Sequence, residues 1–466
     1  MSNNLKDTIC AISTPVGEAG IGIVRLSGSK ALKIADRIFL PGNGKKPSKM
    51  SGYMLHYGHI AQPSSGKSKA EVIDEVLLAV MRAPKSYTKE DVVEINAHGG
   101  IACLKKILSL VVKKGARLAQ PGEFTKRAFL NGRLDLSQAE AVLDMINAKT
   151  EDSLRAAALQ LEGVLSKAVK GIRGSILEIH ADIEALLDFP DEELDIAEKN
   201  NIRSKLNRII SALKQLLKES AGGRILREGI TCVICGKPNV GKSTIMNRLL
   251  KQERVIVTAV AGTTRDAIEE TVNLNGIALK IVDTAGIVEP EDEPSKAGIL
   301  LSRKYIDNAD LILLVIDAGS GLKKEDLEII NSIASKKALV ALNKIDLTAK
   351  IKPQDIKKYL AGKKIVKISA KKNIGIRELE NAIRSMVWSG GVSSASHAMI
   401  TNVRHEAAAK QALRALEEAV KGINTGAGEI TALSLKQAGD ALGLITGEVL
   451  DDDLLDRIFS KFCIGK

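Results

Sequence analysis

The chain has 466 residues, of which 45% are hydrophobic, 27% are charged and 3% are aromatic. This length and apolar content predict about three globular domains and exclude a disordered or fibrous chain. The net charge of +12 favours a polyanionic partner, with simple solubility as the alternative. Because aromatic side chains are scarce, we expect recognition of nucleic-acid shape or backbone rather than base stacking.

Cysteine usage and hydropathy indicate a protein of the reducing cytoplasm. The five cysteines are odd in number and scattered, and neither a signal segment nor an uncharged stretch of membrane-spanning length is visible. Cys232 and Cys235 have the spacing of some redox and zinc sites. We expect neither function, because no second ligand pair accompanies them and strand residues three apart point to opposite faces.

Residues 1–121 mix short β-like runs, such as residues 21–26, with at least two amphipathic helices, which predicts an α+β domain. Residues 122–228 change to long Ala, Leu, Glu and Lys stretches at helical spacing, which predict a helical bundle. Helical spacing returns in the last segment, residues 388–466. Since a lone helix pair is a poor core, we infer one helical domain with residues 229–387 inserted, and a Gly/Ser-rich return linker at 389–397.

Residues 236–243 read Gly-Lys-Pro-Asn-Val-Gly-Lys-Ser, which fits the phosphate-loop pattern G-x-x-x-x-G-K-[ST] at every fixed position. In such a loop backbone N–H groups meet phosphate oxygens, Lys242 supplies charge to the β and γ phosphates, and the Ser243 hydroxyl can bind Mg²⁺. The flanking residues predict a buried strand at 230–234 and a helix at 243–250. Taken alone, the pattern could also be an ordinary Gly-rich turn.

Three further motifs follow apolar strands in the order typical of GTPases: residues 283–286, residues 343–346, and Ser-Ala-Lys at residues 369–371, of which the last two resemble the guanine-specifying elements. Residues 283–286 have the Asp-x-x-Gly pattern that links Mg²⁺ and the γ phosphate to loop position. In residues 343–346, Asn-Lys-Ile-Asp, the final carboxylate can accept from two guanine donors that adenine lacks. Together they predict an α/β Ras-like P-loop GTPase domain. The residues expected to contact GTP are Asn239, Val240, Gly241, Lys242, Ser243, Thr244, Thr258, Ala259, Val260, Ala261, Gly262, Thr263, Thr264, Asp283, Thr284, Ala285, Gly286, Asn343, Lys344, Asp346, Ser369, Ala370 and Lys371.

The residue after the switch glycine is Ile287, where GTPases of the Ras type carry a glutamine that orients the attacking water. Isoleucine cannot orient water, so hydrolysis must recruit another group. Asparagine and backbone carbonyl oxygens are hard ligands that suit a monovalent cation beside the phosphates. We expect Thr264 to join Ser243 on Mg²⁺, by analogy with the switch threonine of other GTPases. The expected K⁺ ligands are Asn239, Thr258, Val260 and Thr263.

Distinctive motifs stand at both ends of the chain: residues 20–28, 84–94 and 98–100, residues 121–132, and the terminal Phe-Cys-Ile-Gly-Lys of residues 462–466. Together with the GTPase motifs, they resemble the MnmE (TrmE) family of tRNA modification GTPases, and the resemblance covers essentially the whole sequence. The resemblance implies a cytoplasmic enzyme that forms a heterotetramer with a flavoprotein of the MnmG (GidA) type. Together they would add a carboxymethylaminomethyl or aminomethyl group to C5 of the wobble uridine of certain tRNAs.

The resemblance also implies a homodimer formed through the N-terminal domain, which would bind 5-formyltetrahydrofolate or a related folate. The implied folate ligands are Arg25, Glu94, Arg133 and Lys466. Arg and Lys suit the glutamate carboxylates of folate, and Glu94 suits the N–H pair of a pterin. Each of these side chains, taken singly, could instead be a solvated surface charge. The family often carries a lysine where this chain has Arg133.

Two candidate catalytic residues come from the same resemblance. Cys463 lies where the family has a cysteine that is important for the modification, and a small buried apolar residue is the alternative. The family also carries a glutamate that positions the attacking water, whereas this chain has Ser295 in that place. Glu293 is the substitute candidate; the remaining carboxylates of this stretch are Glu289, Glu291 and Asp292.

The competing function is a regulatory RNA-binding switch of the Era or Der type, without covalent chemistry. An Era-like chain would end in a KH-type domain with a Gly-x-x-Gly loop, and no clear one follows Trp388. The sequence leaves open which tRNAs are modified and whether ammonium or glycine supplies the amine.

Overall fold

A computed structural model of the chain describes residues 7–62, 70–188, 196–252, 269–274, 276–283, 305–387, 398–449 and 452–466. These residues divide into two compact units. The first consists of the residues up to Leu143 together with Gly439–Lys466, and the second is Asp144–Ala438. Within the described ranges, no helix has the length and apolar character needed to cross a bilayer.

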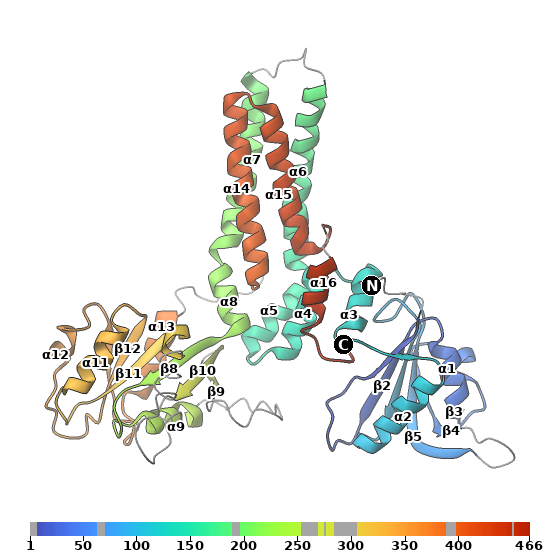
Figure 1. The fold of residues 1–466 in the computed structure, drawn as a ribbon, viewed down its shortest axis with the longest axis horizontal. Coiled ribbons are helices and arrows are strands. Elements are labelled where there is room, and N and C mark those ends of the chain that lie inside the picture. The colour runs from blue at the N-terminus through green and yellow to red at the C-terminus, as the bar shows by residue number, and fades with distance from the viewer. Residues whose placement is uncertain are drawn as a thin grey trace. The chain divides into compact units, whose positions relative to one another are not determined.

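A seven-stranded sheet of order β3-β4-β5-β6-β2-β1-β7 forms the centre of the first unit, drawn in blue in Figure 1. Its strands are antiparallel except for the β1/β7 pair. Two amphipathic helices pack their apolar sides against the same face of this sheet, giving the α+β arrangement that the sequence predicts. The elements are β1 (Ile9–Ile12), β2 (Gly22–Ser27), α1 (Ala31–Ile38), β3 (Phe39–Pro41), β4 (Leu55–Gln62), β5 (Glu71–Met81), β6 (Val92–Ala97), α2 (Ile101–Lys113) and β7 (Arg117–Leu118).

The C-terminal residues of the chain belong to this first unit. Helix α16 (Asp452–Phe459) packs Phe459 against Phe129 at the end of α3 (Glu123–Leu130), with the ring centroids 6.4 Å apart. Gly122, which precedes α3, has φ +69°, and a Cβ there would lie 2.6 Å from the Phe459 carbonyl oxygen. Glycine is therefore required for this close approach of the start of α3 to the end of α16.

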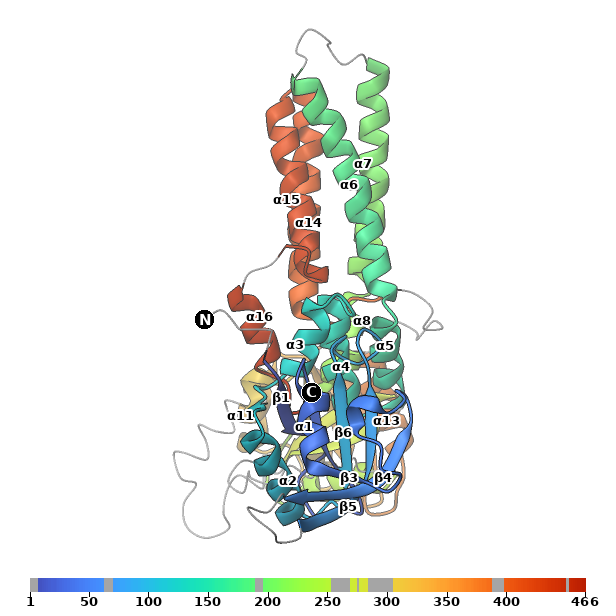
Figure 2. The ribbon, with the colours of Figure 1, turned by 90° about the vertical axis from the view of Figure 1, so that its right-hand side faces the viewer.

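Long helices form the upper part of the second unit, where α6 (Val164–Asp188), α7 (Ile196–Lys218) and α14 (Val403–Thr425) run side by side (Figures 1 and 2). Helix α7 packs against both of the others. The helical residues before and after the GTPase motifs thus pack together, as expected for an inserted domain. The remaining helices of this unit are α5 (Glu151–Leu161) and α8 (Ser220–Glu228), while α4 (Leu136–Asn147) and α15 (Gly428–Thr446) contain residues of both units.

A six-stranded sheet of order β13-β12-β11-β8-β10-β9 forms the rest of the second unit, and all of its pairs are parallel except β9/β10. Helices α9 and α13 pack on one face and α11 and α12 on the other, so the strands are near-continuous apolar runs. This is the predicted α/β fold. Its elements are β8 (Ile230–Cys235), α9 (Lys242–Gln252), β9 (Glu269–Leu274), β10 (Ile277–Asp283), β11 (Leu311–Asp317), α11 (Lys324–Ile333), β12 (Ala338–Asn343), α12 (Pro353–Lys357), β13 (Lys364–Lys367) and α13 (Ile376–Val387).

The two cysteines of strand β8 point to opposite faces of this sheet, as predicted. Cys232 lies in the apolar cluster that includes α9 and α13, and Cys235 lies in the cluster that includes α11 and α12. Burial raises the pKa of each thiol to about 12. Two inert thiols on opposite faces cannot act as a redox or zinc pair.

Candidate functional site

The phosphate loop and the two guanine motifs follow the carboxyl ends of parallel strands of one sheet. The phosphate loop follows β8, the residues of the Asn-Lys-x-Asp motif follow or end β12, and Ser369-Ala370-Lys371 follows β13. Strand β8 lies between β11 and β10, so successive strands are added on opposite sides of it. Ligands of open α/β sheets bind at the carboxyl edge beside such a reversal.

The phosphate loop has a backbone that its glycines make possible. Gly236 has φ +145° and Gly241 has φ +100°, both in the region that favours glycine. A Cβ at Gly236 would lie 2.4 Å from the Val315 carbonyl oxygen, and one at Gly241 would lie 2.4 Å from Asn343 Nδ2. Asn239, an exposed residue at the bend, also has positive φ, at +61°. The loop is therefore curled tightly against β11 and β12.

Lys242 lies inside the curve of this loop. It is 6% exposed, and its Nζ donates to the carbonyls of Gly236 at 2.9 Å and Lys237 at 2.8 Å. Lys242 also begins α9, whose first N–H groups carry the positive end of the helix dipole. Ser243 and Thr244 follow on the exposed first turn of the same helix. An ammonium, a helix N-terminus and a hydroxyl side chain thus gather at one place, which is the chemistry that binds phosphate and Mg²⁺.

The buried amide of Asn343 joins all three motifs. Its Nδ2 donates to the Val240 carbonyl in the phosphate loop at 2.8 Å, and its Oδ1 accepts from the Ala370 N–H at 3.0 Å. The side chain is 2% exposed, so these hydrogen bonds form out of water. The position of the guanine motifs is therefore fixed relative to the phosphate loop.

Asp346 lies exposed beside Ser369 at the same edge. A hydrogen bond from the Ser369 side chain lowers the pKa of Asp346, and Lys372 and Lys371 add to the effect, so the carboxylate is an ionised acceptor. Its neighbour Lys344 has φ +65° and pairs with Asp317 at 2.7 Å. An ionised acceptor at this edge suits the two N–H donors of guanine.

Further contacts around the site are not singled out by the sequence patterns. Arg248 on α9 donates to the carbonyls of Ala370 at 2.9 Å and Lys371 at 3.0 Å. Lys237 of the phosphate loop pairs at 2.5 Å with Asp326 of α11, which is 4% exposed. Arg248 and Asp326 have ordinary helical spacing, so no sequence pattern distinguishes them. Asp317, the partner of Lys344, does follow a pattern, because it ends an apolar strand as Asp283 does.

Several predicted contacts lie outside the described residues. They are Thr258 to Thr264, Thr284 to Gly286, Ile287 and the acidic stretch with Glu289, Glu291, Asp292, Glu293 and Ser295. The return linker at 389–397 lies outside them too. Asp283 ends strand β10, and its backbone pairs with Ile234 of β8. The contacts expected of these residues stay predictions.

A second group of candidate residues gathers in the first unit, on β2 and β6. Arg25 and Glu94 lie directly opposite in the antiparallel ladder, and Arg25 Nε is 2.7 Å from Glu94 Oε1. Their side chains are 15% and 19% exposed, so the interpretation of either as a solvated surface charge is wrong. Arg25 Nη1 also donates to the Gly465 carbonyl at 3.2 Å, which brings Lys466, the next residue, to the same place.

Tyr87 lies between two arginines of this group. Its ring centroid is 5.8 Å from the Arg25 guanidinium carbon and 4.8 Å from that of Arg133. Arg133 also donates to the Tyr87 carbonyl at 2.8 Å. Beside them lies an open pocket of about 570 Å³ that Tyr87 and Arg133 line together with Tyr53, Met81, Pro84, Lys85, Ser86 and Lys89. Two of the four predicted folate ligands, Arg25 and Arg133, are thus near one aromatic ring.

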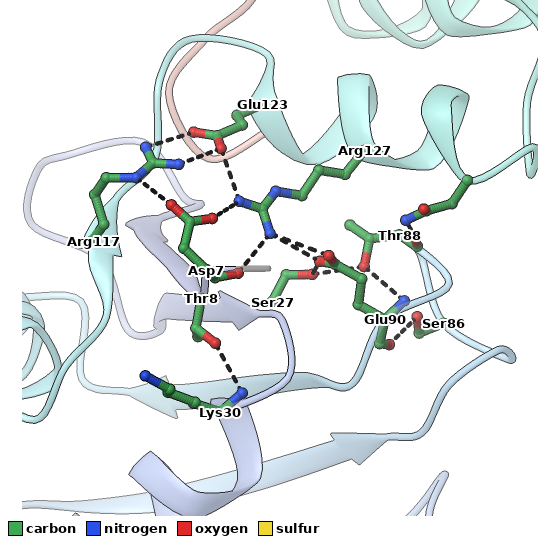
Figure 3. A network of polar contacts seen from close by, with 11 residues as sticks. Asp7, Thr8, Ser27, Lys30, Ser86, Thr88, Glu90, Arg117, Glu123 and Arg127 are labelled. Atoms are coloured by element: carbon green, nitrogen blue, oxygen red, sulfur yellow. Dashed lines mark hydrogen bonds and ion pairs between the residues drawn. The ribbon is translucent and has the colours of Figure 1, made fainter. Parts of the chain in front are cut away.

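An ion network centred on Arg127 lies in the same unit, as Figure 3 shows. Arg127 of α3, 2% exposed, contacts Asp7 at 2.5 Å, Glu123 at 3.0 Å and Glu90 at 3.1 Å. Arg117 contacts Asp7 and Glu123 at 2.7 Å each. Since Glu90 also accepts from Ser27 and lies three residues after Tyr87, the network holds the Tyr87 segment against α3.

The charges of this network perturb one another. Burial by itself would raise the pKa of Glu123, but hydrogen bonds from Arg117, the Gln120 N–H and Arg127 outweigh it and lower the pKa. The pKa of Asp7 is also lowered, because hydrogen bonds and charge from Arg117 and Arg127 outweigh its burial. Both carboxylates are therefore held ionised.

Cys463 is exposed at the end of the first unit. The interpretation of this residue as a small buried apolar side chain is wrong, because Phe462 fills the apolar cluster and turns the following residue outward. A part for Cys463 in catalysis stays a prediction.

The arrangement at the carboxyl edge of the second sheet is that of a P-loop GTPase. Beyond this class, the family profile of the MnmE helical domain matches residues 136–463, and that of the GTP-binding protein TrmE N-terminus matches residues 8–133. The chain therefore belongs to the MnmE (TrmE) family of tRNA modification GTPases.

Relatives agree over the full length. The tRNA modification GTPase MnmE of Acetivibrio thermocellus is 46% identical over 463 residues, which cover 99% of both chains. That of Alkaliphilus metalliredigens is 48% identical over 463 residues, covering 99% of this chain and 100% of the relative.

Solved structures match a smaller part of the chain. The FeoB G-domain of Methanococcus jannaschii is 30% identical over 34% of this chain and 97% of its own, with a TM-score of 0.26. Era of Aquifex aeolicus, bound to GDP·AlF₄⁻, is 31% identical over 40% of this chain and 66% of its own, with a TM-score of 0.28. TM-scores this low support no argument by themselves.

Proposed function

We propose that this chain is a cytoplasmic, GTP-hydrolysing tRNA modification enzyme. With a flavoprotein of the MnmG (GidA) type, in a heterotetramer, it adds a carboxymethylaminomethyl or aminomethyl group to C5 of the wobble uridine of certain tRNAs. The observation that carries the proposal is the combination, in one chain, of the nucleotide-site geometry with both family profiles. The relatives that match over 99% of the chain bear the name tRNA modification GTPase MnmE.

Nucleoside analysis of bulk tRNA tests this function. Cells that lack the protein should lose the wobble-uridine modification, and a plasmid with the unchanged gene should restore it. A plasmid with Lys242→Ala, which removes the ammonium held in the phosphate loop, should not. A normal nucleoside profile in the deleted strain would instead favour the regulatory switch of the Era or Der type.

In the nucleotide site, we propose that Lys242 and the α9 N-terminus bind the phosphates, Ser243 and Thr264 bind Mg²⁺, and Asp346 recognises guanine. Asn239, Thr258, Val260 and Thr263 hold K⁺, and Glu293 positions the attacking water. Support comes from the exposed position of Asn239 at the bend of the loop, beside the buried Lys242. A carboxamide oxygen there can complete a ring of oxygen ligands without adding negative charge.

The cation proposal has a direct test. GTP turnover should fall sharply when K⁺ is replaced by Na⁺, which is too small for the same ligand ring. Asn239→Ala should remove the difference between the salts while nucleotide binding persists. Equal turnover of the unchanged protein in K⁺ and Na⁺ would contradict the proposal.

In the first unit, we propose a folate site at Arg25, Glu94, Arg133 and Lys466, close to the exposed Cys463. The observed residues fit such a ligand. Glu94 accepts a hydrogen bond from Arg25 through Oε1, and the ring of Tyr87 lies beside the guanidinium groups of Arg25 and Arg133. Bound folate would supply the one-carbon unit, while these side chains orient it. Calorimetry with 5-formyltetrahydrofolate should show binding that Glu94→Gln weakens at least tenfold. A Glu94→Gln protein that binds folate normally would contradict this assignment.

We propose that the homodimer forms through the face of the first sheet opposite α1 and α2. There Leu55, Tyr57 and Leu77 are exposed by 60%, 52% and 43%, and Tyr57 and Leu77 are direct neighbours across β4 and β5. An apolar sheet face of this kind is typical of an interface. Tyr57→Glu should give a monomer in analytical ultracentrifugation, whereas a dimer of unchanged stability would contradict the proposal.

We also propose that the domains have the limits expected from the sequence, which are residues 1–121, 122–228, 229–387 and 388–466. Limited proteolysis tests them. The chain should be cut first near residues 228 and 388, releasing a fragment that still binds GTP.

A further inference from the structure

Lysine is concentrated in one segment of the GTPase domain. Residues 336–372 contain twelve lysines, no arginine and two aspartates, a net charge of +10 in a chain whose total is +12. Three of these lysines belong to the nucleotide site: Lys344 pairs with Asp317, and Lys371 and Lys372 act on Asp346. The site does not account for the other nine.

Six of these lysines gather at the amino edge of β12 and β13, and we name them the amino-edge lysine patch: Lys336, Lys337, Lys357, Lys358, Lys363 and Lys364. Leu339 of β12 pairs with Lys364 of β13, so the two strands begin side by side. Lys363 Nζ donates to the Lys336 carbonyl, which ties the two strand starts together.

Helix α12 brings the other two lysines of the patch to the same edge. The helix begins near the carboxyl edge and ends at Lys357, and the Lys363 N–H donates to the Leu360 carbonyl at 3.2 Å in the turn that starts β13. Leu360 is 2% exposed and anchors the turn in the apolar cluster. Lys357 and Lys358 are therefore fixed within a few residues of the strand start.

The charges of this patch are mostly uncompensated. Lys336 pairs with Asp307, whose side chain is 71% exposed, and Lys364 Nζ lies 3.3 Å from Ser385 Oγ. Lys337, Lys357 and Lys358 are exposed, and within the described part of the chain they form no ion pair. Several like charges on one surface repel each other, a cost that a polyanion would remove.

The shape and chemistry of the surroundings favour RNA. A groove of about 540 Å³ continues from Lys364 between the edge strand β13 and α13; Lys364, Lys367 and Asn381 line it together with one acidic residue, Glu378. Tyr359, 49% exposed, stands among the lysines and offers a ring on which a base can stack. Lysine ammonium groups contact phosphates as point charges in any orientation, which suits backbone binding without reading of sequence.

We propose that the amino-edge lysine patch binds the phosphate backbone of RNA, specifically of the tRNA substrate. This inference rests on the proposed function. The patch lies at the edge of the sheet opposite the phosphate loop and Asp346, so RNA and nucleotide bind the same domain at the same time without sharing a residue.

The test is fluorescence anisotropy of a labelled, unmodified tRNA transcript with the full-length protein in GDP, measured over a range of KCl. The triple variant Lys337→Gln, Lys357→Gln, Lys358→Gln should bind at least tenfold more weakly. Its plot of log affinity against log salt should be shallower by about 2, roughly 0.7 to 0.9 per lost phosphate contact. The matched control removes the exposed lysines Lys33, Lys105 and Lys113 of α1 and α2, and should stay within twofold of the unchanged protein.

Charge-preserving Lys→Arg changes at the three patch positions should restore binding, and the basal GTPase rate should be unchanged in every variant. Unchanged affinity and salt slope in the triple variant, or an equal loss in the control, would overturn the patch assignment. Poly-glutamate that competes as well as tRNA at equal charge would overturn the choice of RNA over acidic protein. If the unchanged protein binds no tRNA, the proposed function fails as well.

Discussion

The nucleotide site and the Arg25–Glu94 group are held in place by opposite kinds of polar contact. At the nucleotide site, the neutral amide of Asn343 joins the phosphate loop to the Ser-Ala-Lys loop through two hydrogen bonds. In the unit that holds Arg25 and Glu94, the support is charged: Arg127 and Arg117 share Asp7 and Glu123, and Arg127 also pairs with Glu90.

This difference determines how each region responds to change. A neutral hydrogen bond contributes about 1 kcal/mol and does not titrate. A buried charge is tolerated only while its partners remain, and its loss leaves other charges unpaired in a dry environment. The first unit is therefore the region that mutation and pH should destabilise most, whereas the nucleotide site should respond mainly in ligand affinity.

The largest effect is expected from Arg127→Met. The change keeps the volume but leaves Glu123, 5% exposed, with one cationic partner fewer and Glu90 with none of its Arg127 contacts. We expect the free energy of unfolding of the first unit to fall by about 3 to 5 kcal/mol in urea titrations. Arg117→Met is the matched control; because Arg117 is 41% exposed, water can replace its contacts and the loss should be smaller. Equal losses of unfolding free energy in both variants would contradict the view that the burial of Arg127 makes its ion pairs the more important ones.

The next effect concerns base recognition. Asp346→Asn places an N–H₂ donor opposite the guanine donors, so GTP binding should weaken strongly while xanthosine triphosphate becomes the better ligand. Calorimetry with both nucleotides measures the switch. An unchanged preference for GTP would show that Asp346, though ionised beside Ser369, does not contact the base.

A smaller effect is expected from Asn343→Ala. The Val240 carbonyl and the Ala370 N–H lose their partner in a buried position, at a cost of about 2 kcal/mol in stability of the GTPase domain. GTP affinity should fall too, because the phosphate loop and the Ser-Ala-Lys loop are no longer joined. The loss should be the same at pH 5 and pH 8. A loss that varies with pH would contradict the neutral character of this bridge.

The smallest effect is expected from mild acid. The pKa values of Asp7 and Glu123 are lowered in the fold, so their stabilisation is fully present above their unfolded values of about 4. It is lost as the pH falls through the lower folded values. The first unit should therefore lose thermal stability below about pH 4, and this loss should be reduced in Arg127→Met. If the GTPase domain melted before the first unit over this pH range, the first unit would not be the acid-sensitive region.

The nucleotide site was largely predictable because its chemistry is written in consecutive residues. Gly236 and Gly241 mark the tight turn, and alternation along Ile230–Cys235 already placed Cys232 and Cys235 on opposite faces. The bridge made by Asn343 was not predictable as such. It depends on β12 lying two strands from β8, and no local pattern gives that order.

The ion network centred on Arg127 could not be predicted from periodicity. Its five charged members come from four places in the chain, and helical or strand spacing identifies buried apolar residues, not buried charges. Arg127 resembles any helical surface arginine in the sequence, yet it is 2% exposed. The resemblance to a family placed Arg25 and Glu94 in one site, and their pairing across β2 and β6 gives that placement a physical reason.

The contact between Arg25 and the Gly465 carbonyl has a consequence for the order of synthesis. The two residues are 440 positions apart, so a ribosome adding about 5 to 20 residues per second needs roughly 20 to 90 seconds to make the second after the first. Throughout that interval the sheet of the first unit can form, but Arg25 lacks its final partner and Gly122 lacks the Phe459 backbone. The Arg25–Glu94 group is thus translated early but completed late, because a nascent chain cannot form the contact with Gly465 before its GTPase domain has been synthesised.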